Sequence, residues 1–555
     1  MRDVHQSKPF VWALFLIFTL CWFYALDLRT LVPTDEGRYA EMAREMVASG
    51  DWITTRLNGI KYFEKPPLQT WMNALTFALF GLGEWQARFW TGLSGFLGIL
   101  LTYQAGRCVF NPRVGFLAAL VLGSSLLWAA MGHFNALDMG LSGMMTLALC
   151  GLLIAQRDGA GVRGRRNWML ACWAGMALAV LSKGLIGLAL PGAVLVIYSL
   201  TANDRGIWTR LHIGKGLLLF FAITTPWFVL VSIRNPEFPQ FFFIHEHFQR
   251  FTSEVHHRAG PWYYFIPQLM LGIAPWLGIL FQSLFRGWRS DWHTAPGSTF
   301  KPKRLLLIWA GFIFLFFSVS GSKLPSYILP IFPALALLIA AYWETAGRKQ
   351  MMLTAGLMVI IAAAGLFFVH GIFKLPDAPL EIPLYLAYEQ WLTAAAIVAL
   401  IGGIGAFFQA QHGRGELAAT ILAISAFIGG QLLMIGHDPL GNYASGRPLV
   451  AAINAEMTPD TTLYTVGRLD HSLLFYLRRT MVMVENPDEL SFGLKQQPQL
   501  WLPTRDAFVK QWTAGPKAVA VIKPAIYADL QQRGVPMRII ARDGRRIVIA
   551  NDAKP

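Results

Sequence analysis

The feature that most constrains this chain is a series of apolar runs, each about 18–22 residues long, separated by short polar turns. A helix of about 20 apolar residues is long enough to cross the ~30 Å hydrocarbon core of a bilayer. Only 14% of the 555 residues are charged, whereas an average soluble protein carries roughly a quarter. The sequence therefore predicts a polytopic α-helical membrane protein.

We predict thirteen membrane spans from these runs. Their expected ranges are 9–28, 83–105, 114–131, 139–156, 168–182, 186–201, 215–233, 263–284, 305–320, 327–344, 350–371, 389–409 and 416–436. Short loops rich in Lys and Arg mark the cytoplasmic side of a membrane protein. If the N-terminus lies inside, thirteen crossings place every arginine-rich short loop inside and the C-terminus outside. Loops 29–82 and 234–262 and the tail 437–555 then fall on the outer face.

The formal net charge of +15 is spread over the short loops between spans. Because this distribution is typical of membrane orientation, we expect no nucleic-acid partner. No Walker phosphate loop or dinucleotide fingerprint occurs in the sequence, which argues against nucleotide use.

The last 119 residues have a different pattern from the spans. Short β-branched stretches such as "TLYTV", "TMVMVE" and "KAVAVIK" alternate with helix-like stretches such as "HSLLFYLRR" and "TRDAFVKQW". We therefore predict two domains: a transmembrane domain at 1–436, whose loops 29–82 and 234–262 form the site, and a small α/β domain at 437–555.

The stretch "TDEGRYAEMAREM", residues 34–46, directly follows the first span. Its apolar residues recur at helical spacing and leave Glu41, Arg44 and Glu45 on the other face, which predicts an amphipathic helix lying in the membrane interface. Asp35 stands near the start of this helix. Two interpretations remain open for it: a helix cap, or a chemically active carboxylate.

Two further stretches on the outer face carry candidate ligands. In "KYFEKPPLQTW", the prolines hold Glu64 and Lys65 in an extended segment. These two side chains either form a mutual ion pair or act separately, as a metal or hydroxyl ligand and an anion clamp. In "FFFIHEHFQRF", His245 and His247 do not share a helix face, so a metal here needs a ligand from another loop. An ordinary interfacial or core histidine is the alternative for each.

Three charged residues stand at the predicted outer ends of spans. Asp138 lies in "GHFNALDMG", and Lys183 and Lys323 lie in tight outer turns. Lysines in short outer loops run against the positive-inside trend, and binding an anion at the membrane surface would explain them. Snorkelling to lipid phosphates is the alternative.

The motifs "PTDEGRYAEMAREM", "GDWITTRLNGIKYFEKPPLQTWM" and "SKLPSYILP" resemble those of the bacterial lipid A aminoarabinose transferases. These enzymes are membrane glycosyltransferases of the GT-C architecture. The resemblance covers essentially the whole chain. It implies transfer of 4-amino-4-deoxy-L-arabinose from undecaprenyl phosphate to lipid A phosphates at the periplasmic face of the inner membrane, which masks negative charge and gives polymyxin resistance. We further expect a monomer.

The resemblance also implies roles for matching residues. Asp35 and Asp138 are the expected catalytic carboxylates, and Glu64 and His245 are expected to share a divalent metal, with zinc as the ion that the family pattern implies. The expected substrate-binding residues are Arg38, Tyr39, Tyr62, Lys65, Lys183, Arg250, Lys323 and Tyr327. Cations near the departing phosphate would stabilise the charge that develops there.

Two other functions remain open at this stage. One is a related transferase that moves a hexose or hexuronic acid onto lipopolysaccharide or protein. The other is a lipid flippase, which is disfavoured because the charged residues cluster in outer loops and no internal repeat is visible.

Overall fold

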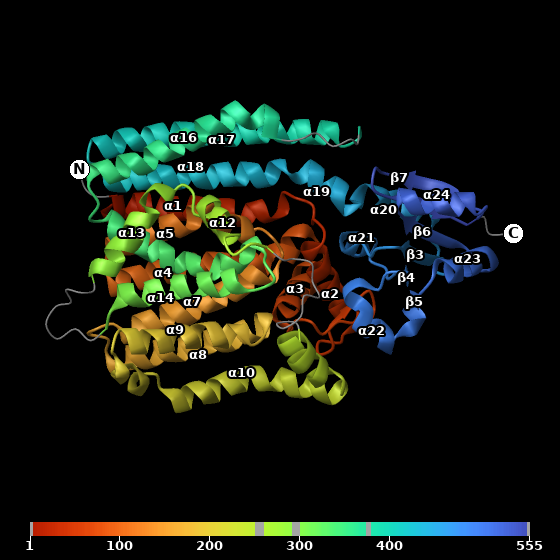
Figure 1. Ribbon diagram of the computed structural model, residues 1–555, viewed down its shortest axis with the longest axis horizontal. Helices are drawn as coiled ribbons and strands as arrows, with labels where there is room; N and C mark the ends of the chain where they lie inside the picture. Colours follow the sequence, from red (N-terminus) through yellow and green to blue (C-terminus); the bar gives the residue numbers. More distant parts are fainter. Residues whose placement is uncertain (1–3, 250–259, 291–299, 373–378, 552–555) are drawn as a thin grey trace. The chain divides into compact units, whose positions relative to one another are not determined.

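The computed structural model of the chain describes residues 4–249, 260–290, 300–372 and 379–551 (Figure 1). It divides into two compact units. The helical unit comprises residues 1–26, 90–372 and 391–434, and the mixed unit comprises 27–89, 373–390 and 435–555.

The helical unit is a bundle of long apolar helices, some of which continue into the mixed unit. They are α1 (Lys8–Tyr24), α4 (Glu84–Val109), α5 (Pro112–Ser124), α6 (Leu126–Gly132), α7 (Leu137–Gln156), α8 (Val162–Lys183), α9 (Ile186–Thr201), α10 (Ile213–Arg234), α12 (Phe265–Gly272), α13 (Leu277–Ser290), α14 (Pro302–Val319), α15 (Phe332–Trp343), α16 (Arg348–Ile372), α17 (Ile382–Gln411) and α18 (Gly415–Gly436). A 3-10 helix, η6 (Pro325–Ile331), precedes α15, and a π-helical segment, η4, covers Gln240–Gln249. Helix α8 packs along α7, α9 and α10.

Each of the thirteen predicted spans coincides with a helix or with a bent pair of helices. Among the described residues, eight helices are long and apolar enough to cross a membrane, or up to ten if each bent pair counts as one span. The two pairs are α5 with α6, bent by 67°, and α12 with α13, bent by 108°. The predicted spans at α4, α8 and α9 are helical but do not meet the same criterion of length and composition.

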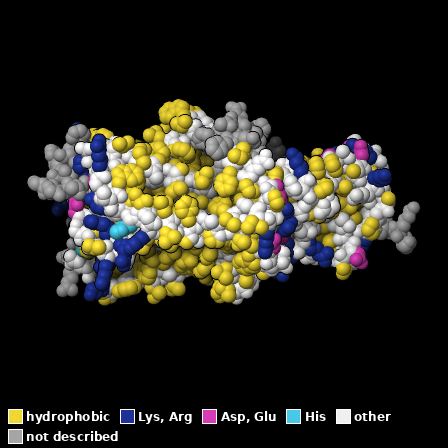
Figure 2. All heavy atoms as spheres, turned by 90° about the horizontal axis from the view of Figure 1, so that it is seen from below, with side chains coloured by type: hydrophobic (Ala, Val, Ile, Leu, Met, Phe, Trp, Pro, Cys, Tyr) yellow, Lys and Arg dark blue, Asp and Glu magenta, His cyan; other side chains and the backbone are white. Residues whose placement is uncertain are grey.

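The surface of the helical unit is the kind that a bilayer solvates. Large side chains such as Leu218, Val319 and Phe367 are 73%, 86% and 79% exposed. Figure 2 shows one face covered with hydrophobic side chains, with Lys and Arg at both ends of this apolar region. Because soluble proteins rarely expose contiguous apolar patches of this kind, the chain is a multi-pass membrane protein.

The mixed unit combines two short helices from the first loop with an α/β fold from the end of the chain. Its helices are α2 (Asp35–Ser49), α3 (Leu68–Phe80), α19 (Asp438–Ser445), α20 (Val450–Glu456), α21 (His471–Leu477), α22 (Ser491–Gln496), α23 (Arg505–Ala514) and α24 (Pro524–Gln532). Its strands are β1 (Arg56–Leu57), β2 (Ile60–Lys61), β3 (Thr462–Val466), β4 (Val482–Val484), β5 (Trp501–Leu502), β6 (Ala518–Ile522), β7 (Arg538–Arg542) and β8 (Ile547–Ala550). The predicted C-terminal α/β fold is confirmed.

Strands β3 to β8 form one sheet in the order β5-β4-β3-β6-β8-β7. The first four of these in spatial order run parallel, and β8 and β7 are antiparallel to their neighbours. Strand β6 is buried along its whole length. This is expected because its sequence "AVAVI" is apolar at every position, which is typical of a strand with both faces of its sheet covered. Phe508 and Trp512 of α23 pack on it with Ile549 of β8.

The first loop is tied to the C-terminal fold by hydrogen bonds across more than 400 residues. The Asn58 side chain donates to the carbonyl of Met481 at 2.8 Å and accepts from its N–H at 2.7 Å. The N–H of Leu31 donates to the Tyr476 hydroxyl at 2.8 Å. Gly37 lies so close to α21 that an added Cβ would stand 2.4 Å from the backbone nitrogen of Ser472.

The helix predicted at 34–46 is present as α2, and its charged face is buried by protein, whereas its position in the membrane interface stays a prediction. Ten of its residues are buried, including Glu36, Arg38, Glu41 and Glu45 of the charged face. Helix α2 packs against α3 and α21. Its polar face therefore contacts protein, and each buried charge has a partner in place of water.

Candidate active site

Asp35 stands at the first position of α2 and faces Arg38. Its Oδ1 accepts a hydrogen bond from Arg38 Nη1 at 3.0 Å, and its side chain is 35% exposed. The N-cap residue is Thr34, and no side chain caps this end of the helix. The helix-cap interpretation of Asp35 is therefore wrong, and its carboxylate keeps lone pairs that a ligand can reach.

Arg38 continues from Asp35 to a second, more buried acid. Its Nη2 lies 2.9 Å from Glu489 Oε2, and Glu489 Oε1 lies 3.0 Å from His471 Nε2. Burial alone would raise the pKa of Glu489, but His471 and Arg38 together lower that pKa to about 2. Glu489 is thus ionised at neutral pH and fixes the Arg38 guanidinium beside Asp35.

Tyr39 and Tyr62 lie buried near this charge pair. The Arg38 guanidinium stands 5.9 Å from the centre of the Tyr39 ring. Burial raises the pKa of both phenols well above the usual value, and the nearby carboxylates add to the effect. Both hydroxyls therefore keep their protons at neutral pH, and the Tyr62 hydroxyl donates to a carboxylate oxygen of Glu64.

Glu64 and Lys65 form the mutual ion pair that the sequence left open. Lys65 Nζ lies 3.5 Å from Glu64 Oε2 and donates to the Glu64 carbonyl at 3.0 Å. The Tyr62 hydroxyl donates to the same Glu64 oxygen at 3.3 Å. Helix α3 starts at Leu68, directly after Pro67, so the two prolines end the extended segment as predicted. This arrangement joins Tyr62, Glu64 and Lys65 in one polar group.

A second group lies in the helical unit, where α7 begins and α8 ends. Lys183 donates to Asp138 Oδ1, and the Ser326 hydroxyl donates to Asp138 Oδ2 at 2.9 Å. The Lys183 ammonium also stands 4.4 Å from the centre of the Tyr327 ring. Three predicted residues, Asp138, Lys183 and Tyr327, are therefore brought together. Ser326 was not predicted, although it lies within the motif "SKLPSYILP".

Lys323 is placed differently from Lys183. Its ammonium donates to the carbonyls of Ser318 and Ser320 at 2.7 and 2.8 Å, and only 5% of the residue is exposed. These carbonyls belong to the end of α14, so Lys323 satisfies a helix C-terminus. Its predicted part in substrate binding stays a prediction.

The remaining predicted residues lie where the structure describes little. His245 is part of η4, but its side chain lies outside the described residues, and so does Arg250. Within the described part of the chain, no three His, Cys, Asp or Glu side chains form a group that would hold a metal ion. The metal at Glu64 and His245 therefore stays a prediction.

A buried ion pair that the sequence did not single out holds the start of α2 in place. Arg88 and Glu36 are fully buried, with Nε–Oε1 and Nη2–Oε2 distances of 2.6 and 2.8 Å. Arg88 also donates to the carbonyls of Arg29 and Thr30, and Glu36 accepts from the N–H of Val32. The sequence does contain a signal for this pair: Arg88 lies within the predicted span 83–105, and an arginine in a span requires a partner.

Comparison with known proteins first defines the class. Residues 64–230 match the model of the dolichyl-phosphate-mannose-protein mannosyltransferases, and residues 449–551 match the model of the aminoarabinose transferase C-terminal domain. With its many apolar helices and its small α/β fold, the chain is a membrane glycosyltransferase of the GT-C architecture.

The particular family follows from curated relatives and a solved structure. An undecaprenyl phosphate-α-4-amino-4-deoxy-L-arabinose arabinosyl transferase of Edwardsiella ictaluri is 30% identical over 493 residues, which is 86% of each chain. One from Proteus mirabilis is 30% identical over 92% of each chain. A crystal structure of ArnT from Cupriavidus metallidurans bound to undecaprenyl phosphate matches with 42% identity and a TM-score of 0.93, over 99% of this chain and 100% of that one. The chain belongs to this family of aminoarabinose transferases.

Proposed function

We propose that this protein transfers 4-amino-4-deoxy-L-arabinose from undecaprenyl phosphate to phosphate groups of lipid A. The observation that carries the proposal is the match, over 99% of the chain, to an ArnT structure that holds undecaprenyl phosphate. In this proposal the N-terminus is cytoplasmic, and the transfer takes place at the periplasmic face of the inner membrane. The added amine masks a phosphate charge and lowers the affinity of the surface for polymyxin.

The reaction displaces polyprenyl phosphate from the anomeric carbon of the sugar. Negative charge develops on the departing phosphate oxygens, and positioned cations stabilise it. We assign this role to Lys65 and Arg250. Lys65 is held at its Glu64 neighbour by a 3.5 Å ion pair, so its ammonium is positioned before the donor arrives.

The chemical nature of the group that accepts the sugar determines the role of the Asp35 carboxylate. A phosphate monoester has a second pKa of about 6 and is largely ionised at pH 7, so it attacks without a general base. The transferred sugar carries an amino group, which is cationic at neutral pH. The partly exposed Asp35 carboxylate, already oriented by Arg38 at 3.0 Å, is suited to bind that ammonium and so to orient the sugar.

Product analysis tests the proposal. Lipid A from a strain that lacks the endogenous transferase should gain a 4-amino-pentose, seen by mass spectrometry, only when this chain is expressed. Asp35→Asn should lower the transfer rate at least tenfold at every pH from 6 to 8, because an orienting role does not depend on proton removal. Asp460→Asn, which changes an exposed acid of the C-terminal domain, is the matched control.

The same assay separates the proposal from its rivals. A hexose or hexuronic acid on lipid A or on protein would indicate a related transferase, which the match of 64–230 to a protein mannosyltransferase model makes the second candidate. Unchanged lipid A and protein in the presence of the folded chain would refute sugar transfer altogether.

A zinc ion at Glu64 and His245 remains part of the proposal. Zinc usually takes four ligands, and Glu64 supplies one carboxylate that already contacts Lys65 and Tyr62. The described residues thus offer an incomplete ligand set, and no reaction step above depends on a metal. Metal analysis of the purified protein, with transfer measured before and after chelation and readdition of zinc, tests this part.

A further inference from the structure

The C-terminal sheet contains a topological switch point that the transfer reaction does not use. The chain runs outward from β3 to β4 and β5, and then returns to form β6 on the other side of β3. Strands β3 and β6 are parallel neighbours, so their carboxyl ends lie at the same edge. In open α/β sheets, ligands bind in the crevice at the carboxyl ends of the strands where the strand order reverses.

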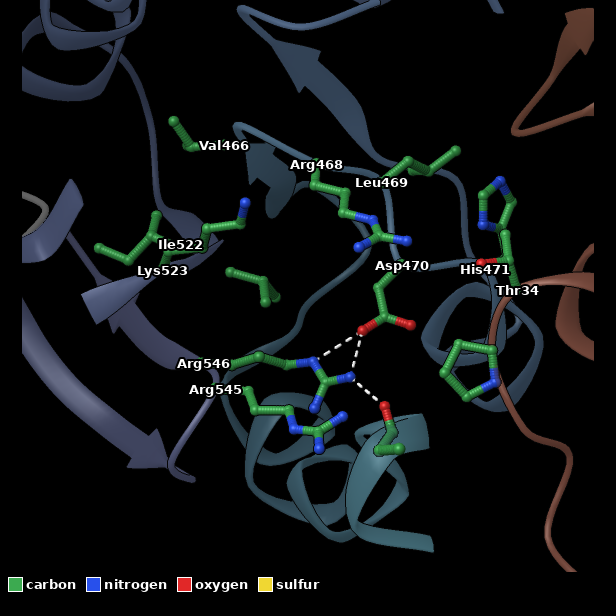
Figure 3. A pocket seen from close by; sticks show the side chains of 13 residues that line it. Thr34, Val466, Arg468, Leu469, Asp470, His471, Ile522, Lys523, Arg545 and Arg546 are labelled. Carbon is green, nitrogen blue, oxygen red and sulfur yellow. Dashed lines mark hydrogen bonds and ion pairs between the residues drawn. The ribbon is translucent and has the colours of Figure 1, made fainter. Parts of the chain in front are cut away.

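A cavity of about 170 Å³ lies at this edge (Figure 3). It is lined by residues that follow β3, among them Arg468 and Asp470, and by the end of β6 with Lys523. Sites that enclose drug-sized ligands typically measure about 300–1,000 Å³. The smaller volume suits a polar headgroup rather than a lipid chain.

Positive charge surrounds the cavity. Four of its lining residues are basic, and Asp470 is the one acid among them. Arg546 is buried and paired, with Nη2 2.5 Å from Asp470 and Nη1 3.0 Å from Asp543. Arg545 pairs with Glu381 at 3.1 Å. These two arginines are fixed by acids.

Arg468 and Lys523 are not fixed in this way. Both side chains are exposed, and within the described part of the chain neither has a hydrogen bond or an ion pair. Lys523 also precedes the first turn of α24, whose N-terminus favours negative charge. Two available cations at the mouth of a cavity form a site for an anion, and arginine matches phosphate geometry in particular.

Asp470 indicates what else the ligand carries. Its Oδ2 accepts from Arg546 Nε at 2.7 Å, whereas its Oδ1 is buried and has no hydrogen-bond partner among the described residues. A buried carboxylate oxygen without a donor costs free energy unless a ligand supplies one. A hydroxyl or amino group of a saccharide satisfies this oxygen, whereas an anion without an O–H or N–H group cannot.

We propose that this cavity, which we call the switch-point cavity, binds a phosphorylated saccharide. Its phosphate lies between Arg468 and Lys523, and a sugar hydroxyl or amino group donates to Asp470 Oδ1. Thr34, the N-cap residue of α2, also lines the cavity, so an occupant touches the segment that leads into Asp35. The proposal rests on the C-terminal fold and does not depend on the transfer reaction.

The test measures binding to the full-length protein in nanodiscs of zwitterionic lipid. Glucose 1-phosphate, inorganic phosphate and glucose are titrated, and the broadening of the ligand signals is followed by ³¹P and ¹H NMR. The double variant Arg468→Ala/Lys523→Ala should weaken glucose 1-phosphate binding at least tenfold. The matched control, Lys510→Ala/Arg542→Ala, removes two exposed cations of the same domain that do not line the cavity.

The remaining arms identify the ligand and its source. Asp470→Asn should weaken glucose 1-phosphate more than inorganic phosphate, provided that its melting temperature stays at the wild-type value. If lipid A added to the nanodiscs displaces glucose 1-phosphate, the natural source is a lipid headgroup; if it does not, the source is a soluble sugar phosphate. A dissociation constant within twofold of wild type in the double variant, or an equal loss in the control, overturns the proposal. A wild-type protein that binds glucose 1-phosphate but transfers no sugar to lipid A would instead count against the proposed function alone.

Discussion

Removing the Arg88 guanidinium should loosen the segment that carries Asp35. Arg88→Met leaves the Glu36 carboxylate, which is 0% exposed, without its cation. Breaking one partner out of a buried pair costs about 3–5 kcal/mol. At about 1.4 kcal/mol per power of ten, the protection of nearby amides against hydrogen exchange should fall by two to three and a half powers of ten.

Hydrogen exchange with mass spectrometry measures this directly. The amide of Leu31 is the reporter, because its N–H donates to the Tyr476 hydroxyl at 2.8 Å and keeps that acceptor when Glu36 is replaced. In a double-mutant cycle, Arg88→Met/Glu36→Met should regain much of the protection, because no buried charge is left unpaired. Arg447→Met is the control. The Arg447 side chain, which pairs with Glu84, is half exposed, so loss of this ion pair should cost about 0–1 kcal/mol.

Two results would refute the reasoning. Protection within threefold of wild type in Arg88→Met would show that the pair does not hold this segment. If the loss of protection in the double variant, expressed as free energy, equals the sum of the losses in the two single variants, the two side chains do not interact. If the reasoning holds, transfer activity should fall together with the protection, because Asp35 precedes Glu36 in the same turn.

Three other predictions concern Lys183 in the helical unit and Glu45 and Gly37 in α2. Lys183→Met should lower transfer at least tenfold, because it leaves the buried Asp138 carboxylate unpaired; product formation in nanodiscs measures it. Burial, assisted by the neighbouring Glu41, raises the pKa of Glu45 from 4.5 to about 8, so the folded protein holds an extra proton between these values and loses stability as pH rises through them. Glu45→Gln should remove that slope in thermal unfolding between pH 5 and pH 8. Gly37→Ala should push α2 away from α21 and cost about 1–3 kcal/mol, measured by hydrogen exchange of α2.

Matched changes serve as controls for these predictions. Gly164→Ala adds a Cβ that meets nothing within 4 Å, so it should leave exchange unchanged. Lys303→Met removes a lysine from the first turn of α14 and should leave transfer unchanged. A pH slope that persists in Glu45→Gln would place the titrating group elsewhere.

The elements of this fold were predictable because their signals are local. Each span is a continuous apolar run, and the strands of the C-terminal sheet are short runs such as 518–522 between turn residues. The grouping of Asp138 with Lys183 was also accessible, since both stand at the outer ends of successive predicted spans. The local sequence pattern was sufficient to predict each feature that depends on a single helix or a single strand.

The surroundings of Arg38 were not predictable in the same way. Its partner Glu489 is 451 residues away in the chain, and nothing in the stretch that contains Glu489 marks it as an ion-pair partner. The burial of the charged face of α2 was not predictable for a related reason. Its charged face looks solvated in the sequence, but Glu36, Arg38 and Glu41 each find a charged partner inside the protein.

The long-range ties of the first loop also set an order of events during synthesis. Asn58 emerges early, but the backbone of Met481 to which it bonds is made more than 400 residues later. Contacts so distant in sequence form slowly, because a long loop must close first. The face of α2 that packs against α21, and the Arg38 guanidinium whose partner is Glu489, therefore stay uncovered until almost the whole chain exists. A truncated chain that lacks the last hundred residues would keep its membrane helices and yet never complete the surroundings of Asp35.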